Sequence, residues 1–112
     1  MHIELTPDAL LRQLDYPVNE KTLEQITIII NNMPDYKHLS KHILTLKDYI
    51  THYYGFIAMS NSKNYLKIKC EPDESEDNIR AFKKAVEDWS DKYKVKLEQV
   101  DNRPTYYIIG QL

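Results

Sequence analysis

The spacing of apolar residues changes three times along this chain, and these changes constrain the fold more than any other feature. Up to residue 53 the apolar residues recur every three or four positions, and over 56–70 they alternate with other residues. The helical spacing returns over 79–93 and the alternation over 95–109. Side chains repeat about every 3.6 residues around a helix and every two along a strand. The pattern predicts the α+β class, with three N-terminal helices followed by two β-hairpins separated by an amphipathic helix (ααα-ββ-α-ββ) and a four-stranded mixed or antiparallel sheet.

Capping residues mark the starts of the N-terminal helices. Thr6 is predicted to cap the first helix, and Asn19 is predicted to cap the second. The third helix is predicted to run from about Asp35 to Tyr53. Buried stripes are predicted at Leu23, Ile26, Ile30 and Met33 of the second helix and at Leu39, Ile43, Leu46 and Ile50 of the third. The run ITIII at 26–30 also resembles a strand, but its cap and stripe favour a helix.

Two hairpins and one helix are predicted for the second half of the chain. Alternation predicts strands at 55–60 and 65–71 and at 95–100 and 105–110, with turns at 61–64 and 101–104. A helix capped by Ser75 is predicted between the hairpins. Its apolar residues, which step by three and four, are Ile79, Phe82, Val86, Trp89 and Tyr93. We expect this helix to cover the apolar face of the sheet.

Length and composition predict a single folded domain. We expect one α+β domain over 1–112, with a helical portion at 1–54 and a ββαββ portion at 55–112. Apolar residues make up 42% of the chain and charged residues 29%, which is the balance of a globular protein. The formal net charge of −2 creates no global attraction to nucleic acid or to an anionic membrane.

The sequence favours a cytoplasmic protein without a membrane partner. The first eleven residues lack a basic segment followed by an apolar run, so no signal peptide is expected. The longest purely apolar run, at 28–30, is far shorter than the roughly 20 residues that cross a bilayer. Cys70 is the only cysteine, which excludes a disulfide within the chain.

The chain has few residues that suggest catalysis. Gly55 and Gly110 are its only glycines and lie far apart, so there is no glycine-rich loop of the kind that cradles phosphates. The five serines belong to no nucleophile motif. We therefore favour a non-catalytic function without a cofactor. An enzyme without a recognisable motif is the third alternative, behind two binding functions.

His38 and His42 are the candidate metal ligands of this sequence. They lie four residues apart on the third predicted helix, where two imidazoles can share a zinc ion. Asp35 precedes His42 by roughly 10 Å of helix, at about 1.5 Å per residue, so one ion does not reach both. We therefore interpret the two histidines as the margin of the core, and we predict no metal site.

Tyrosines and surplus apolar residues favour a contact surface with another protein or with a second copy of the chain. There are nine tyrosines, and a tyrosine offers a large contact area and a hydroxyl at a low entropy cost. The predicted contact residues are Tyr49, Tyr53, Tyr54, Phe56, Tyr107 and Ile109. For any single tyrosine the alternative is a place at the margin of a small core. The sequence thus predicts a small cytoplasmic protein-interaction module that can self-associate.

Nucleic-acid binding through the polar face of the sheet is the alternative function. The predicted residues are Tyr65, Lys67, Lys69 and Lys96, because rings placed between cations can stack bases and hold phosphates. Glu98 on the same face and the negative net charge argue against it. The competing interpretation is that the first three helices partly cover this face, which would explain Phe56 and Ile109 there.

Overall fold

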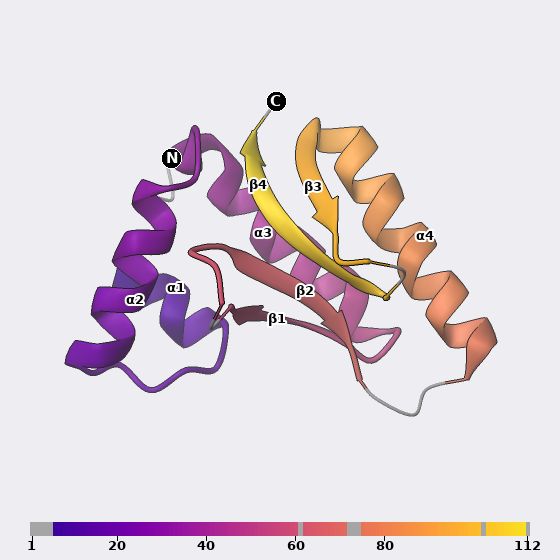
Figure 1. Cartoon of the computed structure of the whole chain (residues 1–112), viewed down its shortest axis with the longest axis horizontal. Coiled ribbons are helices and arrows are strands. Elements are labelled where there is room, and N and C mark those ends of the chain that lie inside the picture. Colours follow the sequence, from indigo (N-terminus) through magenta and orange to yellow (C-terminus); the bar gives the residue numbers. More distant parts are fainter. Residues whose placement is uncertain (1–5, 61, 72–74, 102, 112) are drawn as a thin grey trace.

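The chain folds in the predicted order, as an α+β protein with a four-stranded antiparallel sheet (Figure 1). The computed structural model describes residues 6–60, 62–71, 75–101 and 103–111. The helices are α1 (Pro7–Gln13), α2 (Glu20–Asn31), α3 (Tyr36–Thr51) and α4 (Glu76–Tyr93). The strands are β1 (Gly55–Met59), β2 (Leu66–Cys70), β3 (Val95–Gln99) and β4 (Thr105–Gln111). Parts of the predicted N-terminal segment and of both predicted turns, at 1–5, 61 and 102, lie outside the described residues.

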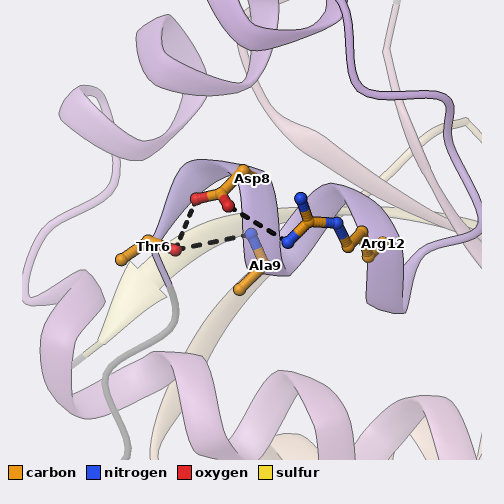
Figure 2. A network of polar contacts seen from close by, with 4 residues as sticks. All are labelled: Thr6, Asp8, Ala9 and Arg12. Atoms are coloured by element: carbon orange, nitrogen blue, oxygen red, sulfur yellow. Dashed lines mark hydrogen bonds and ion pairs between the residues drawn. The ribbon is translucent and has the colours of Figure 1, made fainter.

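Thr6 starts α1 as predicted. Its hydroxyl accepts a hydrogen bond from the Ala9 amide at 3.4 Å and donates one to Asp8 Oδ1 at 2.6 Å (Figure 2). Asp8 also pairs with Arg12 one turn later, at 3.1 Å. The Thr6 hydroxyl is the main reason why the pKa of the Asp8 carboxyl is lowered. Because this network is exposed, its main effect is to define where α1 begins.

Asn19 starts α2 through a reciprocal capping box. Its side chain accepts from the Thr22 amide, and the Thr22 hydroxyl accepts from the Asn19 amide, both at 3.0 Å. The predicted stripe of α2 did not include Ile29, which is buried like Ile26 and Met33, whereas the predicted Leu23 and Ile30 are half-buried against the core. These isoleucines share one arc of the helix. The docking of α2 against its neighbours decides which of them turns inward, and spacing alone does not.

The two longer helices carry the predicted stripes. α3 begins at Tyr36, after Asp35, whose backbone is left-handed (φ 54°) and whose side chain forms no cap. Its stripe is confirmed, since Leu39, Ile43, Leu46 and Ile50 are all fully buried. Ser75 caps α4 as predicted, with its hydroxyl 3.1 Å from the Asn78 amide. None of the described helices is both long and apolar enough to cross a lipid bilayer.

The sheet places β4 between β2 and β3. The strand order is β1-β2-β4-β3, and every neighbouring pair is antiparallel, which decides between the two predicted arrangements. Because α4 connects β2 to β3 across β4, these elements form a split β-α-β unit. The β3–β4 register shifts between Lys96 and Leu97, which leaves Ile109 of β4 without a paired residue.

The core lies between one face of the sheet and the layer formed by α3 and α4, and buried residues of α1 and α2 extend it. α3 contacts β1 and β4, and α4 contacts β3 and α3. Strand residues on this covered face include Ile57, Met59, Leu66, Ile68, Val95 and Ile108, all at most 6% exposed. A Cβ on Gly55 would come within 2.6 Å of Phe82 and 2.8 Å of Ile50, so both helices approach β1 closely. The prediction that α4 covers the apolar face is confirmed, and α3 shares that role.

The opposite face of the sheet is open. Figure 1 shows α3 behind the sheet, whereas α1 and α2 lie beside its β1–β2 end. The Tyr16 hydroxyl accepts from the Met59 amide at 2.9 Å, and the Asn32 side chain donates to the Asn64 carbonyl at 3.0 Å. These contacts hold α1 and α2 at that end. Figure 1 shows no helix of the described part of the chain over the second face, so the alternative in which the first three helices partly cover it is wrong.

Candidate functional site

A groove of about 270 Å³ opens between α3 and α4. We call it the aromatic groove, and its lining residues are Tyr49 and Tyr53 of α3 with Ala81, Lys84, Ala85, Asp88, Trp89, Lys92 and Tyr93 of α4. Four of these nine lining residues are aromatic. Ala81 and Ala85 lie one turn apart, and their small side chains leave room that any larger residue would fill. The groove therefore combines aromatic walls with space between the helices.

Contacts within the helical layer hold the walls of the aromatic groove. The Trp89 indole donates to the His42 carbonyl at 2.8 Å, and Trp89 is only 3% exposed. The Tyr93 ring stacks on the His42 imidazole, with centroids 4.1 Å apart and planes 24° apart. Tyr49, in contrast, is 56% exposed and also borders a smaller hollow with His52. Two walls are thus fixed by α3–α4 contacts, while Tyr49 stays accessible to a partner.

The charges around the aromatic groove are mainly positive. Lys84 pairs with Asp88 at 2.9 Å, and this exposed pair is close to neutral. The Lys92 ammonium lies 5.4 Å from the centroid of the Tyr93 ring, and the ion pairs between described residues do not include it. Asp88 is thus paired with Lys84, and the charge of Lys92 is left without a carboxylate partner among the residues that line the groove.

A second hollow, of about 420 Å³, lies on the open face of the sheet. We call it the sheet hollow, and its lining residues are Phe56, Ser62, Lys67, Lys69, Cys70, Val100, Arg103, Pro104, Thr105 and Tyr107. The register explains this grouping, because Phe56 pairs with Lys69, and Lys69 pairs with Thr105. The hairpin turns supply the remaining sides, with Ser62 at one end and Arg103 at the other.

Tyr107 lies at the base of the sheet hollow and is largely covered by the β1–β2 turn. It is 8% exposed, its hydroxyl lies 3.4 Å from the Ser62 hydroxyl, and the Lys63 ammonium lies 5.1 Å from its ring centroid. The Ser62 contact, then that of Ser60, and the charges of Lys63 and Lys67 lower the pKa of Tyr107. The positive charge of this face thus favours the ionised form of the Tyr107 phenol.

The predicted contact residues do not form one surface. Tyr49 and Tyr53 line the aromatic groove, whereas Phe56 and Tyr107 line the sheet hollow. The other two, Tyr54 and Ile109, line neither: Tyr54 follows α3 with a left-handed backbone and is 60% exposed, and Ile109 is the half-buried residue of the β4 bulge.

The residues predicted to bind nucleic acid are only partly brought together. Lys67 and Lys69 line the sheet hollow. The Tyr65 ring lies beside it, 6.0 Å from that of Tyr107. Lys96 pairs with Gly110 beyond the bulge and does not line the hollow. Arg103, which the prediction did not include, supplies the third cation there.

His38 and His42 are neighbours on the surface of α3. Their ring centroids are 5.3 Å apart, and His42 is half-buried whereas His38 is exposed. Burial, followed by the charges of His38 and Lys41, lowers the pKa of His42. Among the described residues, no group of three or more His, Cys, Asp or Glu side chains is arranged to hold a metal ion.

Sequence reasoning missed Ala81, Ala85 and Arg103. The alanines are separated by one helical turn, but this spacing does not indicate that another helix packs opposite them or that this helix carries tyrosines. Arg103 lies in a predicted turn, where a lone arginine is an ordinary surface residue. Comparison with protein-family models, with curated proteins and with solved structures found no match to this chain. Its function is therefore argued from its own residues.

Proposed function

We propose that the protein is a non-catalytic interaction module that binds a short segment of another protein in the aromatic groove. The observation that supports this proposal is a hollow of about 270 Å³ with four aromatic side chains in its walls. Binding sites are typically concave and mostly apolar, and tyrosine and tryptophan are enriched where partners bind. A cytoplasmic location belongs to the same proposal and is supported by the single cysteine, Cys70, which is buried.

Size and charge define the segment that fits. From Ala81 to Lys92 the groove extends about 16 Å along α4, which accommodates roughly three turns of helix or five extended residues. An apolar side chain fits against Ala85, between the aromatic walls. An acidic side chain fits beside Lys92, whose charge lacks a compensating carboxylate in the groove. The proposed ligand is therefore a short apolar segment with an acidic residue at one end.

Selection from a random displayed peptide library, followed by affinity measurement, tests this proposal. We expect selected peptides to carry the apolar and acidic pattern. The fluorescence anisotropy of a labelled peptide should rise to a plateau as the protein is added. Ala85→Leu should weaken binding at least about tenfold, because the added side chain occupies the groove. Thr27→Leu, which adds the same side chain at an exposed position of α2, is the matched control and should bind as wild type does.

Two outcomes would contradict the proposal. One is a selection without convergent peptides, or with peptides that bind the Ala85→Leu variant as tightly as wild type. The other concerns the identity of the partner. Sedimentation could show that the wild-type protein and the Thr27→Leu variant are dimers, whereas the Ala85→Leu variant is a monomer. That result would assign the groove to a second copy of this chain.

A further inference from the structure

The sheet hollow carries an inference that the aromatic groove does not. It lies on the face of the sheet that no described helix covers, between the β1–β2 and β3–β4 turns. Its volume of about 420 Å³ exceeds that of the aromatic groove. Its lining combines three cations, several hydroxyls and a half-buried phenylalanine, whereas the groove is lined mainly by aromatic and small side chains and one Lys–Asp pair with a second lysine.

Three cations face the sheet hollow, and their charge is not neutralised locally. Lys67 and Lys69 project from the same face of β2, about 7 Å apart along the strand. Arg103 joins them from the β3–β4 turn. The ion pairs between described residues involve none of these three side chains. A ligand with spaced negative charges therefore complements this hollow.

A carboxylate and a fourth cation lie at the edges of this surface. Glu98 pairs with Tyr107 across β3 and β4 but does not line the hollow. On the other side, the Lys63 ammonium lies over the Tyr107 ring, at 5.1 Å. The positive charge is thus local, in a chain whose formal net charge is −2.

Phe56 distinguishes a single strand from other polyanions. It is half-buried beside Lys69, its cross-strand partner, so an aromatic side chain and a cation line the same part of the hollow. Unpaired bases can stack on such a ring while their phosphates contact the lysines, whereas the bases of a duplex are already stacked and paired. We propose that the sheet hollow binds single-stranded nucleic acid, with Lys67, Lys69 and Arg103 on its phosphates and Phe56 against a base.

Fluorescence anisotropy with labelled oligo-dT and oligo-rU strands tests this proposal. With three phosphate contacts, log Kd should rise with log salt at a slope of about 2, so affinity should fall roughly 15-fold between 50 and 200 mM salt. Replacing two of the three cations, in Lys67→Gln/Lys69→Gln, should reduce that slope to about 0.7. The matched control, Lys21→Gln/Lys41→Gln, removes the same charge from exposed positions on α2 and α3 and should keep the wild-type slope.

The contribution of Phe56 is separable from that of charge. Phe56→Leu keeps an apolar side chain but removes the aromatic ring, so we expect at least about fivefold weaker binding with an unchanged salt slope. Thermal melts of each variant establish that it is folded. Ala85→Leu, which fills only the aromatic groove, should bind the strands as wild type does, so the two proposals fail independently.

Several results would overturn the assignment. Equal affinity for a duplex of the same length would exclude recognition of a single strand. Equal affinity for a polyaspartate peptide would make the hollow a site for acidic polypeptides instead. Unchanged binding by the folded Lys67→Gln/Lys69→Gln variant, or no measurable binding by wild type at 50 mM salt, would reject this site.

Discussion

The two faces of the sheet are built from alternating residues of the same strands, yet they have different environments. On β2, Ile68 is fully buried under the helical layer, whereas its neighbours Lys67 and Lys69 are half-exposed on the open face. On β4, Tyr106 faces the core and Tyr107 faces the hairpin turn. Helices cover the first face over most of its area, and short turns cover the second only in part.

This difference shows where binding surfaces arise in a small α+β protein. Helices bury an apolar face almost completely, and α3 and α4 leave usable space beside Ala81 and Ala85, in the aromatic groove. Turns cover a mixed face partially, so Tyr107 is buried while Lys67 stays accessible beside it. The helical layer thus offers an apolar groove, and the open face offers a charged hollow.

The largest expected effect tests the contrast between adjacent residues of β2. Ile68→Ala should lower the free energy of unfolding by about 2–5 kcal/mol, because it leaves a cavity beneath the helices. Lys67→Ala should change it by no more than about 0.5 kcal/mol. Urea unfolding followed by circular dichroism measures both. Similar losses in the two variants would mean that the open face is packed like a core.

A close approach on the covered face should make Gly55 intolerant of a side chain. Gly55→Ala places a Cβ against Phe82 and Ile50 and should destabilise the fold by about 1–3 kcal/mol. Ala58→Ser is the control on the open face of the same strand, and should stay within about 0.5 kcal/mol of wild type. A Gly55→Ala variant as stable as wild type would show that α3 and α4 move apart readily.

The adjacent tyrosines of β4 should respond in opposite directions when their hydroxyls are removed. The Tyr106 hydroxyl is buried and makes no hydrogen bond with the described residues, so Tyr106→Phe should stabilise the protein by about 1 kcal/mol. The Tyr107 hydroxyl contacts that of Ser62, so Tyr107→Phe should destabilise by up to about 1 kcal/mol. Paired denaturant curves measure both, and shifts of the same sign would remove the contrast.

Ionisation of the two phenols provides an independent test of the same contrast. Burial, and then the charge of Glu87, raises the pKa of Tyr106 to about 12, whereas contacts on the open face lower that of Tyr107. In an alkaline titration followed by tyrosinate absorbance, Tyr106→Phe should remove the ionisation that occurs at the highest pH. Tyr107→Phe should remove one that occurs at lower pH. Because Tyr106 keeps its proton longer when folded, its contribution to stability is complete below about pH 10 and is lost as pH rises toward 12.

The smallest expected effect concerns His42, at the rim of the helical layer. Its pKa is lowered in the folded state, so the unfolded chain binds the proton more tightly. The contribution of His42 is therefore complete above its ordinary pKa near 6.5 and is lost as pH falls below that value. His42→Phe, which retains a ring against Tyr93, should reduce the decline in stability between pH 7 and 5. An unchanged decline would exclude His42 as its cause.

Prediction from the sequence succeeded where the signal was local. The caps at Thr6, Asn19 and Ser75 depend on hydrogen bonds within a few residues, and all three are confirmed. It did not find Ile29, because the rotation of α2 depends on distant contacts. It named both Tyr49 and Phe56 as contact residues, and only the structure assigns them to different hollows.

The sequence by itself determined the order of helices and strands, their starting residues, and which residues of each strand turn toward the core. These properties depend on spacing between near neighbours, which a linear pattern contains. Only the tertiary structure decided that α3 tyrosines meet α4 alanines, and that Arg103 joins Lys67 and Lys69. Such groupings depend on helix packing and strand order, which bring together residues that lie far apart along the chain.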